Sequence, residues 1–231
     1  MKFNWEFFRS YLTGRIVEKT SSTINPILEV NYINGKYHLD SEHVNYSNGN
    51  LYKVFKKTFH KIHFESYHPK DILLLGFGAG SVASLIQDKY HNDCNFVSVE
   101  KDQEVIRLGS KYFNTARFRH NNIICADAND FINENHQHFD LIVFDCYIDS
   151  EVPDQLEKNK FLEGLHHALK KGGMLLFNKF VFDKKSETSA GNLKIEFDKL
   201  PDETELFYIR ENGFHFHEKH VNWMFVHHRQ N

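Results

Sequence analysis

Short apolar runs alternate with helix-like segments along the chain between residues 71 and 180. Consecutive apolar residues predict strands that are buried on both faces, as in a parallel sheet covered by helices. In the intervening segments apolar residues recur at intervals of three and four, which predicts amphipathic helices. This alternation predicts a doubly wound, Rossmann-like α/β domain with a mostly parallel sheet. The strands are expected at residues 72–76, 95–100, 122–127, 140–145 and 174–180, and the helices at residues 81–90, 103–113, 129–135 and 155–173.

The last part of the chain departs from this alternation. Residues 205–212 and 222–229 are two β-prone runs that lie close together in the sequence. They predict an antiparallel pair that closes one edge of the sheet. A polar stretch at residues 183–192 precedes them. We interpret this stretch as a mobile loop, with a lid over the site as the alternative.

Two Asn-Gly pairs organise the beginning of the chain. Residues 1–20 carry apolar side chains at helical spacing, which predicts a helix. Asn34-Gly35 stands between two alternating runs and predicts a β-hairpin, because both residues tolerate positive φ. Asn48-Gly49 precedes a helical stripe over residues 50–62. We therefore expect an N-terminal helix and small β-hairpin region with a linking helix at residues 1–62, followed by the α/β domain at residues 63–231.

Composition and charge narrow the possible function classes. The 231 residues are 41% hydrophobic and 26% charged, as is ordinary for a globular domain. A formal net charge of -3 argues against a nucleic-acid-binding surface. Charged residues interrupt the opening segment, unlike a signal peptide, and no run reaches the roughly 18 apolar residues that span a bilayer. We expect a cytoplasmic protein with neither nucleic acid nor membrane as a partner.

Cysteines and histidines give only weak patterns for metal binding. The three cysteines are odd in number and far apart, so we expect reduced thiols. A His-Phe-His alternation near the end of the chain places two imidazoles on one strand face, as a metal site could. Solvated strand positions are the more common explanation, and no metal is expected. The histidines concerned are His215, His217, His220, His227 and His228.

A glycine-rich bend follows the first predicted parallel strand. Gly76, Gly78 and Gly80 allow the backbone to turn sharply and to approach a ligand closely. Glu100 ends the next strand, where a carboxylate can accept hydrogen bonds from both hydroxyls of a ribose. These two features predict a nucleoside site. Ser81 stands where a dinucleotide fingerprint has its third glycine, so the spacing favours S-adenosylmethionine (SAM) over NAD.

Several motifs in succession resemble the spermidine synthase (aminopropyltransferase) family of the SAM-methyltransferase superfamily. They are "ILLLGFGAGSV", "VSVEKDQEVIRLGSKYF", "CADANDFI", "FDLIVFDCYID" and "FLEGLHHALKKGGMLLF", in the order and at the spacing of that family. The resemblance covers about residues 71–178 and implies the SAM-methyltransferase fold. It also implies SAM or decarboxylated SAM as the cofactor, a small-molecule acceptor such as an amine, and a homodimer.

The resemblance assigns roles to individual residues. It implies that Glu100 holds the ribose, that Asp127 binds the adenine amino group, and that Asp145 helps to deprotonate the attacking amine. A carboxylate at a strand end can both attract an ammonium group and accept its proton. The implied cofactor-site residues are Gly76, Phe77, Gly78, Ala79, Gly80, Glu100, Lys101, Asp127 and Ala128. The implied catalytic residue is Asp145, and the implied substrate-binding residues are Tyr52, Tyr147 and Asp149.

The chain departs from the family pattern on the substrate side. Ala79 replaces the family's aspartate in the glycine-rich loop, and Asn48 and Gly49 stand where acidic residues bind the diamine. Asp149 follows Asp145 at a spacing one residue longer than in the family. Without the loop carboxylate, ordinary SAM is no longer repelled. Three interpretations therefore stay open: aminopropyl transfer, methyl transfer to a small acceptor, and a non-catalytic nucleoside-binding or scaffold protein.

Overall fold

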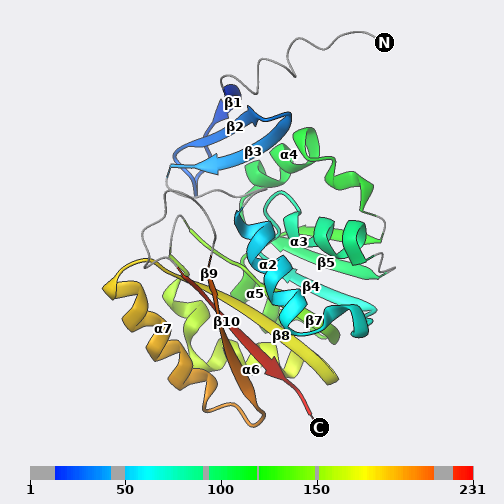
Figure 1. Cartoon of the computed structure of the whole chain (residues 1–231), viewed down its shortest axis with the longest axis vertical. Helices are drawn as coiled ribbons and strands as arrows, with labels where there is room; N and C mark the ends of the chain where they lie inside the picture. Colours follow the sequence, from blue (N-terminus) through cyan, green and yellow to red (C-terminus); the bar gives the residue numbers. More distant parts are fainter. Residues whose placement is uncertain are drawn as a thin grey trace.

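The computed structural model describes residues 14–42, 50–90, 94–118, 120–148, 151–210 and 221–230. Within these residues, a seven-stranded sheet has the order β6-β5-β4-β7-β8-β10-β9 (Figure 1). The strands from β6 to β8 run parallel, and β10 and β9 pair antiparallel at the edge beyond β8. The strands are β4 (Asp71–Leu75), β5 (Asn95–Glu100), β6 (Asn121–Cys125), β7 (Phe139–Phe144), β8 (Leu169–Val181), β9 (Thr204–Arg210) and β10 (Val221–His228).

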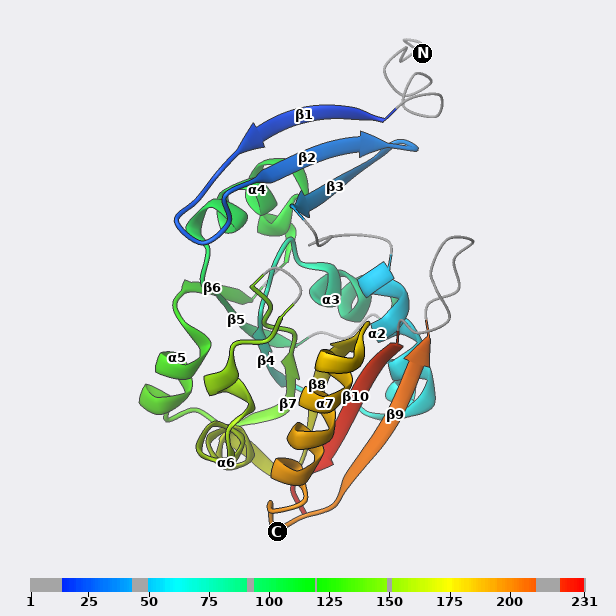
Figure 2. The same cartoon turned by 90° about the vertical axis from the view of Figure 1, so that its left-hand side faces the viewer.

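Helices cover both faces of this sheet, because successive residues of the central strands enter two different apolar clusters. Ile72 and Leu74 of β4 pack in the cluster that includes α2 and α3, whereas Leu73 and Leu75 pack in the cluster that includes α5, α6 and α7. Figure 2 shows α6 and α7 beside β8 and β10. The helices are α2 (Asn50–Lys61), α3 (Ser81–Ser84), α4 (Gln103–Tyr112), α5 (Ala128–Glu134), α6 (Asn159–Ala168) and α7 (Lys184–Phe197), and a π-helical turn, Leu85–Lys89, continues α3.

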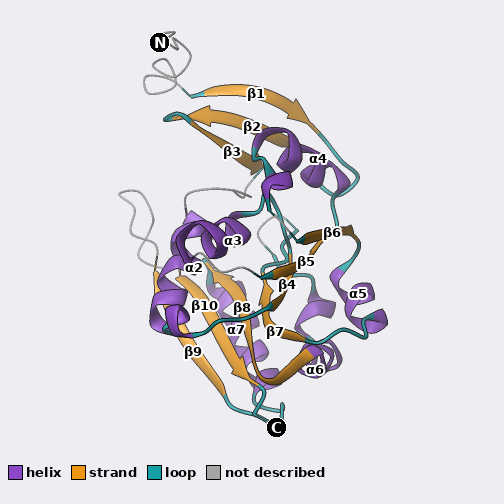
Figure 3. Ribbon diagram, turned by 90° about the vertical axis from the view of Figure 1, so that its right-hand side faces the viewer, coloured by secondary structure: helices purple, strands orange, loops and turns teal. Residues whose placement is uncertain are grey.

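A second sheet of three antiparallel strands precedes the α/β domain. It consists of β1 (Arg15–Thr20), β2 (Leu28–Ile33) and β3 (Lys36–Ser41). Asn34 and Gly35 both have positive φ, at 50° and 74°, and join β2 to β3 as the predicted hairpin turn. Figure 3 shows this sheet arching over α4. The fold predicted from the sequence, including the antiparallel edge and the N-terminal hairpin, is confirmed.

Three local predictions were wrong. Residues 15–20 form strand β1 rather than helix, because they pair with β2; the apolar positions before residue 14 lie outside the described residues. Helix α6 ends at Ala168 and β8 begins at Leu169, since residues 169–173 already join the sheet. The polar stretch at residues 183–192 belongs to helix α7 rather than to a loop.

Helix α7 forms although its sequence is mostly polar. Asp183 caps its first turn by accepting a hydrogen bond from the Ser186 amide at 2.7 Å, and the Ser186 side chain in turn bonds the Asp183 amide. Ala190, Leu193 and Phe197 then supply a narrow buried stripe against the sheet. A good cap and three well-placed apolar residues outweigh the polar composition. In the described residues, the structure contains no helix that meets the length and hydropathy needed to cross a membrane.

Candidate functional site

The glycine-rich loop leaves β4 in a conformation that side chains other than glycine rarely adopt. Gly76, Gly78 and Gly80 have φ values of 83°, 55° and 81°. A Cβ atom on Gly76 would collide with the backbone carbonyl of Asp145, and one on Gly80 would lie 2.7 Å from the Phe118 ring. Positive φ and close approach both require glycine here. The loop therefore keeps its backbone against the carboxyl end of β7, where Asp145 lies.

Glu100 ends β5 directly beside this loop. Its carboxylate accepts hydrogen bonds from the Gly78 amide at 2.9 Å and from the Asp102 amide at 3.1 Å, one on each oxygen. Burial raises the pKa of Glu100, while these two amides oppose that rise by stabilising the charged form. Each carboxylate oxygen has more than one acceptor site, so capacity for ribose hydroxyls is left over. The sequence-predicted pair of glycine loop and acid thus lies together in space.

Asp127 lies at the end of the neighbouring strand β6, at the N-cap of α5. It accepts a hydrogen bond from the Asn129 amide at 2.8 Å and forms an ion pair with Lys101 at 2.9 Å. Burial favours the neutral acid, but the hydrogen bonds from Lys101 and from the backbone prevail and lower the pKa of Asp127. Ala128 follows it and is buried. This corner presents an ionised carboxylate next to an apolar surface, which suits an amino-substituted ring.

Asp145 follows β7 and faces a polar group on β8. Its backbone amide donates to the Leu75 carbonyl at 2.8 Å, and its Oδ1 accepts a hydrogen bond from Asn178 Nδ2 at 2.8 Å. Desolvation raises the pKa of Asp145 to about 7; the Asn178 hydrogen bond lowers it, and the charge of Glu100 raises it. A carboxyl group whose pKa is near neutrality can gain and lose a proton readily under ordinary conditions.

Asn178 and Asp102 were not found from the sequence. Asn178 directly follows the apolar run at residues 174–177 of β8, and this asparagine at the end of a buried run was the available signal. Asp102 follows Glu100 by two residues and caps α4 by accepting a hydrogen bond from the Glu104 amide at 2.9 Å. Both residues hold a predicted carboxylate in place, one by its side chain and the other by its backbone.

The remaining predicted residues lie in different settings. The Tyr147 hydroxyl donates to the Asn178 carbonyl at 2.9 Å and accepts from the Phe180 amide at 2.8 Å, so it braces β8. Tyr52 lies in the first turn of α2 and is partly buried against the apolar core. Asp149 lies outside the described residues, as do Asn48 and Gly49.

The two loop positions between the glycines carry apolar side chains that pack in two different apolar clusters. Phe77 is buried against Phe118, with ring centroids 6.3 Å apart, in the cluster under α2 and α3. Ala79 is buried with Val105 and Leu108 of α4 and with residues of β2 and β3. Both contribute to the shape of the loop through packing. Of the predicted cofactor set, Glu100, Asp127 and the glycines supply the polar or backbone groups.

The histidines named as a metal alternative do not form one cluster within the described residues. His215, His217 and His220 lie outside them. His227 is fully buried and pairs with His166 at 2.9 Å between ring nitrogens, and Thr204 bonds its other nitrogen at 2.8 Å. In the described part of the chain, no group of three or more His, Cys, Asp or Glu side chains is placed so that it could hold a metal ion.

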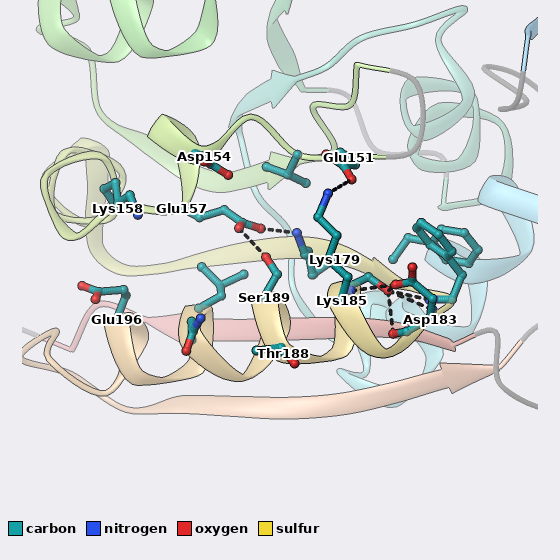
Figure 4. A pocket seen from close by; sticks show the side chains of 16 residues that line it. Glu151, Asp154, Glu157, Lys158, Lys179, Asp183, Lys185, Thr188, Ser189 and Glu196 are labelled. Atoms are coloured by element: carbon teal, nitrogen blue, oxygen red, sulfur yellow. Dashed lines mark hydrogen bonds and ion pairs between the residues drawn. The ribbon is translucent and has the colours of Figure 1, made fainter.

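A pocket of about 630 Å³ lies between α7, β8 and the segment that follows β7 (Figure 4). At its base Lys179 and Glu157 form a buried ion pair at 2.5 Å, and Ser189 of α7 donates to Glu157 at 2.8 Å. Residues of the polar stretch 183–192 line it, but none of the predicted catalytic, cofactor-site or substrate-binding residues does. The ion pair joins the turn at residues 154–157 to β8, Ser189 adds α7 to this contact, and we assign the pocket no part in the nucleoside site.

Comparison with known proteins decides the family. The model of the spermine/spermidine synthase domain matches residues 52–189, which is more than half of the chain. The chain belongs to this family. The predicted resemblance is therefore confirmed at the level of the family.

Individual relatives are more distant. A polyamine aminopropyltransferase from Vibrio vulnificus is 28% identical over 127 residues, which cover 52% of this chain and 42% of the relative. The chain spans less than half the length of the curated relatives that it matches first.

Solved structures agree with the fold. A probable spermidine synthase from Corynebacterium glutamicum superimposes with a TM-score of 0.74 at 17% identity, covering 93% of this chain and 80% of that chain. Human methyltransferase-like protein 13 in complex with SAH superimposes with a TM-score of 0.61 at 18% identity, covering 80% of this chain and 83% of that chain. Members of both groups thus share this Rossmann-like architecture.

Proposed function

We propose that this member of the family binds SAM or decarboxylated SAM and transfers an alkyl group to a small acceptor amine. The glycine loop, Glu100 and Asp127 lie at the carboxyl ends of β4, β5 and β6, where nucleotide-like ligands bind in sheets of this kind. Gly78, with a φ of 55°, turns its amide onto the Glu100 carboxylate at 2.9 Å, so the loop backbone and the acid that would hold the ribose lie together. When bound, the sulfonium supplies an electrophilic carbon and leaves as a neutral thioether.

The proposal depends most on the position of the Asp145 carboxylate at the end of β7. An ammonium acceptor has no free lone pair until it loses a proton, and Asp145 is the carboxylate at the end of β7 that can take it. Its pKa of about 7 leaves a large ionised fraction at neutral pH. The nitrogen then forms its bond to carbon as the carbon–sulfur bond breaks, and the proton passes from Asp145 to solvent.

Aminopropyl transfer is the first candidate, because the family match includes Asp145 and because the curated relatives are named as aminopropyltransferases. In this reaction Asp145 serves as base and attracts the cationic acceptor.

Methyl transfer is the second candidate, and the environment of Ala79 favours it. The loop position that carries a carboxylate in the resembling family is here buried among apolar residues. No charge at this position discriminates between a cofactor that ends in an ammonium and one that retains its α-carboxylate.

Titration calorimetry with SAM, decarboxylated SAM and 5′-methylthioadenosine tests the nucleoside site. Glu100→Ala should weaken binding by about 1 to 3 kcal/mol, because charge-assisted hydrogen bonds to the ribose are lost. Glu196→Ala is the matched control, since Glu196 of α7 pairs with Lys199, which follows that helix. Equal affinity in wild type and Glu100→Ala would contradict the site, and no binding of any of the three ligands would favour the scaffold interpretation.

The nucleoside product separates the two reactions. Incubation with a mixture of diamines and each cofactor should release 5′-methylthioadenosine if an aminopropyl group is transferred, and S-adenosylhomocysteine if a methyl group is transferred. Asp145→Asn should abolish product formation while leaving nucleoside affinity unchanged. Full activity of that variant would exclude Asp145 as the base.

A further inference from the structure

The N-terminal sheet is firmly docked beside the proposed nucleoside site. Leu28, Val30 and Leu39 of this sheet pack against α4 and against Ala79 of the glycine loop. Glu18 of β1 forms ion pairs with Arg107 and with Lys111 of α4, the latter at 2.6 Å. Figures 2 and 3, which view the molecule from opposite sides, both show the sheet lying across α4. The sheet and the nucleoside site therefore share α4 and the glycine loop as common supports.

Asp102 is the residue where the two parts meet. Its Oδ2 accepts hydrogen bonds from Asn25 Nδ2 at 2.7 Å and from the Ser22 hydroxyl, and its Oδ1 caps α4 through the Glu104 amide. Asn25 and Asp102 are each 3% exposed, so water cannot easily replace these bonds. If Asp102 lost its donor Asn25, the buried carboxylate would be left partly unsatisfied, and a different position of the Asp102 side chain would be favoured.

The connection between β1 and β2 is built to present Asn25. The Ser22 hydroxyl accepts the Ile24 amide at 3.1 Å and the Asn25 amide at 2.9 Å, and the Ser22 amide bonds the Asn25 carbonyl at 2.8 Å. These local bonds close a tight turn and fix the backbone from which the Asn25 side chain reaches Asp102. The Asn25 amide group is therefore aimed at α4 by its own loop.

A continuous series of hydrogen bonds runs from this turn to the glycine loop. Asn25 donates to the side chain of Asp102, the Asp102 amide donates to Glu100, and the other oxygen of Glu100 accepts the Gly78 amide. The Glu100 carboxylate has no direct contact with the N-terminal sheet in this series. Its orientation depends on where the backbone of Asp102 is held.

We propose that Asn25 is a positioning residue for the nucleoside site, which acts through Asp102 to fix the carboxylate of Glu100. This inference rests on the proposed function, because the ligand whose ribose meets Glu100 is the one named there. It assigns the N-terminal sheet a part in binding the nucleoside. Loosening the turn at Asn25 should thus weaken a ligand that Asn25 does not touch.

The test compares Asn25→Ala with Asn31→Ala. Asn31 lies on β2 of the N-terminal sheet and donates to Asp40 at 2.9 Å. Asn31→Ala therefore loses a similar amide–carboxylate hydrogen bond away from Asp102. Calorimetry with 5′-methylthioadenosine should show about a tenfold loss of affinity for Asn25→Ala and no change for Asn31→Ala. Amide hydrogen exchange, followed by NMR without ligand, should accelerate at Gly78 and Asp102 in the first variant alone.

The two measurements separate the inference from the proposed function. Unchanged affinity together with unchanged exchange at Gly78 in Asn25→Ala would overturn the inference. If wild type binds no nucleoside but exchange accelerates, the series of hydrogen bonds stands and the proposed ligand falls. If Asn25→Ala does not fold, Asn25→Ser is judged by the same two measurements. If Asn31→Ala lowers the melting temperature as much as Asn25→Ala does but keeps its affinity, lost stability alone does not explain the weaker binding of Asn25→Ala.

Discussion

Replacing Asn178 with leucine should raise the pKa of Asp145 and leave the fold intact. Asn178 Nδ2 donates to Asp145 Oδ1 at 2.8 Å, whereas Asn178 Oδ1 is buried without a hydrogen-bond partner among the described residues. Leucine has the same number and branching of side-chain heavy atoms, and it removes an unsatisfied oxygen along with the donor. The Tyr147 hydroxyl bonds the backbone carbonyl of residue 178, and this contact survives the substitution.

The size of the effect follows from the lost hydrogen bond. A hydrogen bond to a charged group contributes about 1.5 to 3 kcal/mol, and one pKa unit corresponds to about 1.4 kcal/mol. Because the donor stabilises the ionised carboxylate, its loss raises the pKa of Asp145 from about 7 to about 8–9. A reaction that needs the carboxylate should then slow by about ten- to a hundredfold below this pKa and recover at higher pH.

A carbon-13 NMR titration of the Asp145 carboxyl measures this shift directly, and the pH dependence of product formation measures its consequence. Asn121→Ala serves as control, because Asn121 accepts a hydrogen bond from Ser98 at 2.8 Å at the opposite end of the sheet. An unchanged or lowered pKa in Asn178→Leu would refute the reasoning. Activity lost equally at every pH would mean that Asn178 contacts the substrate instead.

Three further predictions concern the supports of the site and of the sheet. Gly76→Ala should lose more than about 1 kcal/mol of stability and all nucleoside binding, since φ is 83° and its Cβ meets a backbone carbonyl; a wild-type melting temperature would contradict this. Burial, and then the charge of His166, lower the pKa of His227 to about 4. The unfolded chain therefore binds a proton that the folded chain excludes, so unfolding free energy should fall by about 3 kcal/mol as pH drops from about 6.5 to about 4. In His227→Asn this pH dependence should flatten, as measured by denaturant unfolding. Glu157→Gln leaves Lys179 buried without its counter-charge and should cost about 3 to 5 kcal/mol in the same assay. Adding Lys179→Met should restore most of that loss, and an additive double variant would argue against the pairing.

The sheet covered by helices on both faces could be predicted, because every residue of a central strand is then buried. In β4, Ile72 and Leu74 face one layer of helices and Leu73 and Leu75 face the other, so all four had to be apolar. Helix α7 could not be predicted in this way. It covers the sheet with few buried residues, and the rest of its surface faces solvent and the pocket beside Lys179.

The candidate site was predictable where function constrains neighbouring residues of the chain. The glycine loop and Glu100 belong to adjacent parallel strands joined by one helix, and this order brings the loop and the acid together. Asn178 and Asn25 lie 33 and 77 residues from the carboxylates that they hold. The local sequence does not indicate which carboxylate each asparagine meets, because an isolated asparagine in a strand or a turn has many possible partners. Only the packing of the folded chain selects one of them.

Ala79 shows how a departure from a family pattern changes meaning once its surroundings are known. From the sequence, alanine in place of aspartate is a missing charge. In the structure, Ala79 contributes to the apolar contact of the glycine loop with Leu28, Val30 and Leu39. A carboxylate at this position would have to be desolvated against these side chains or push the N-terminal sheet away. Alanine at this position fits the apolar docking of the sheet on the loop, the same docking that brings Asn25 to Asp102. The proposed loss of charge selection and the proposed support of Glu100 would thus both depend on this docking.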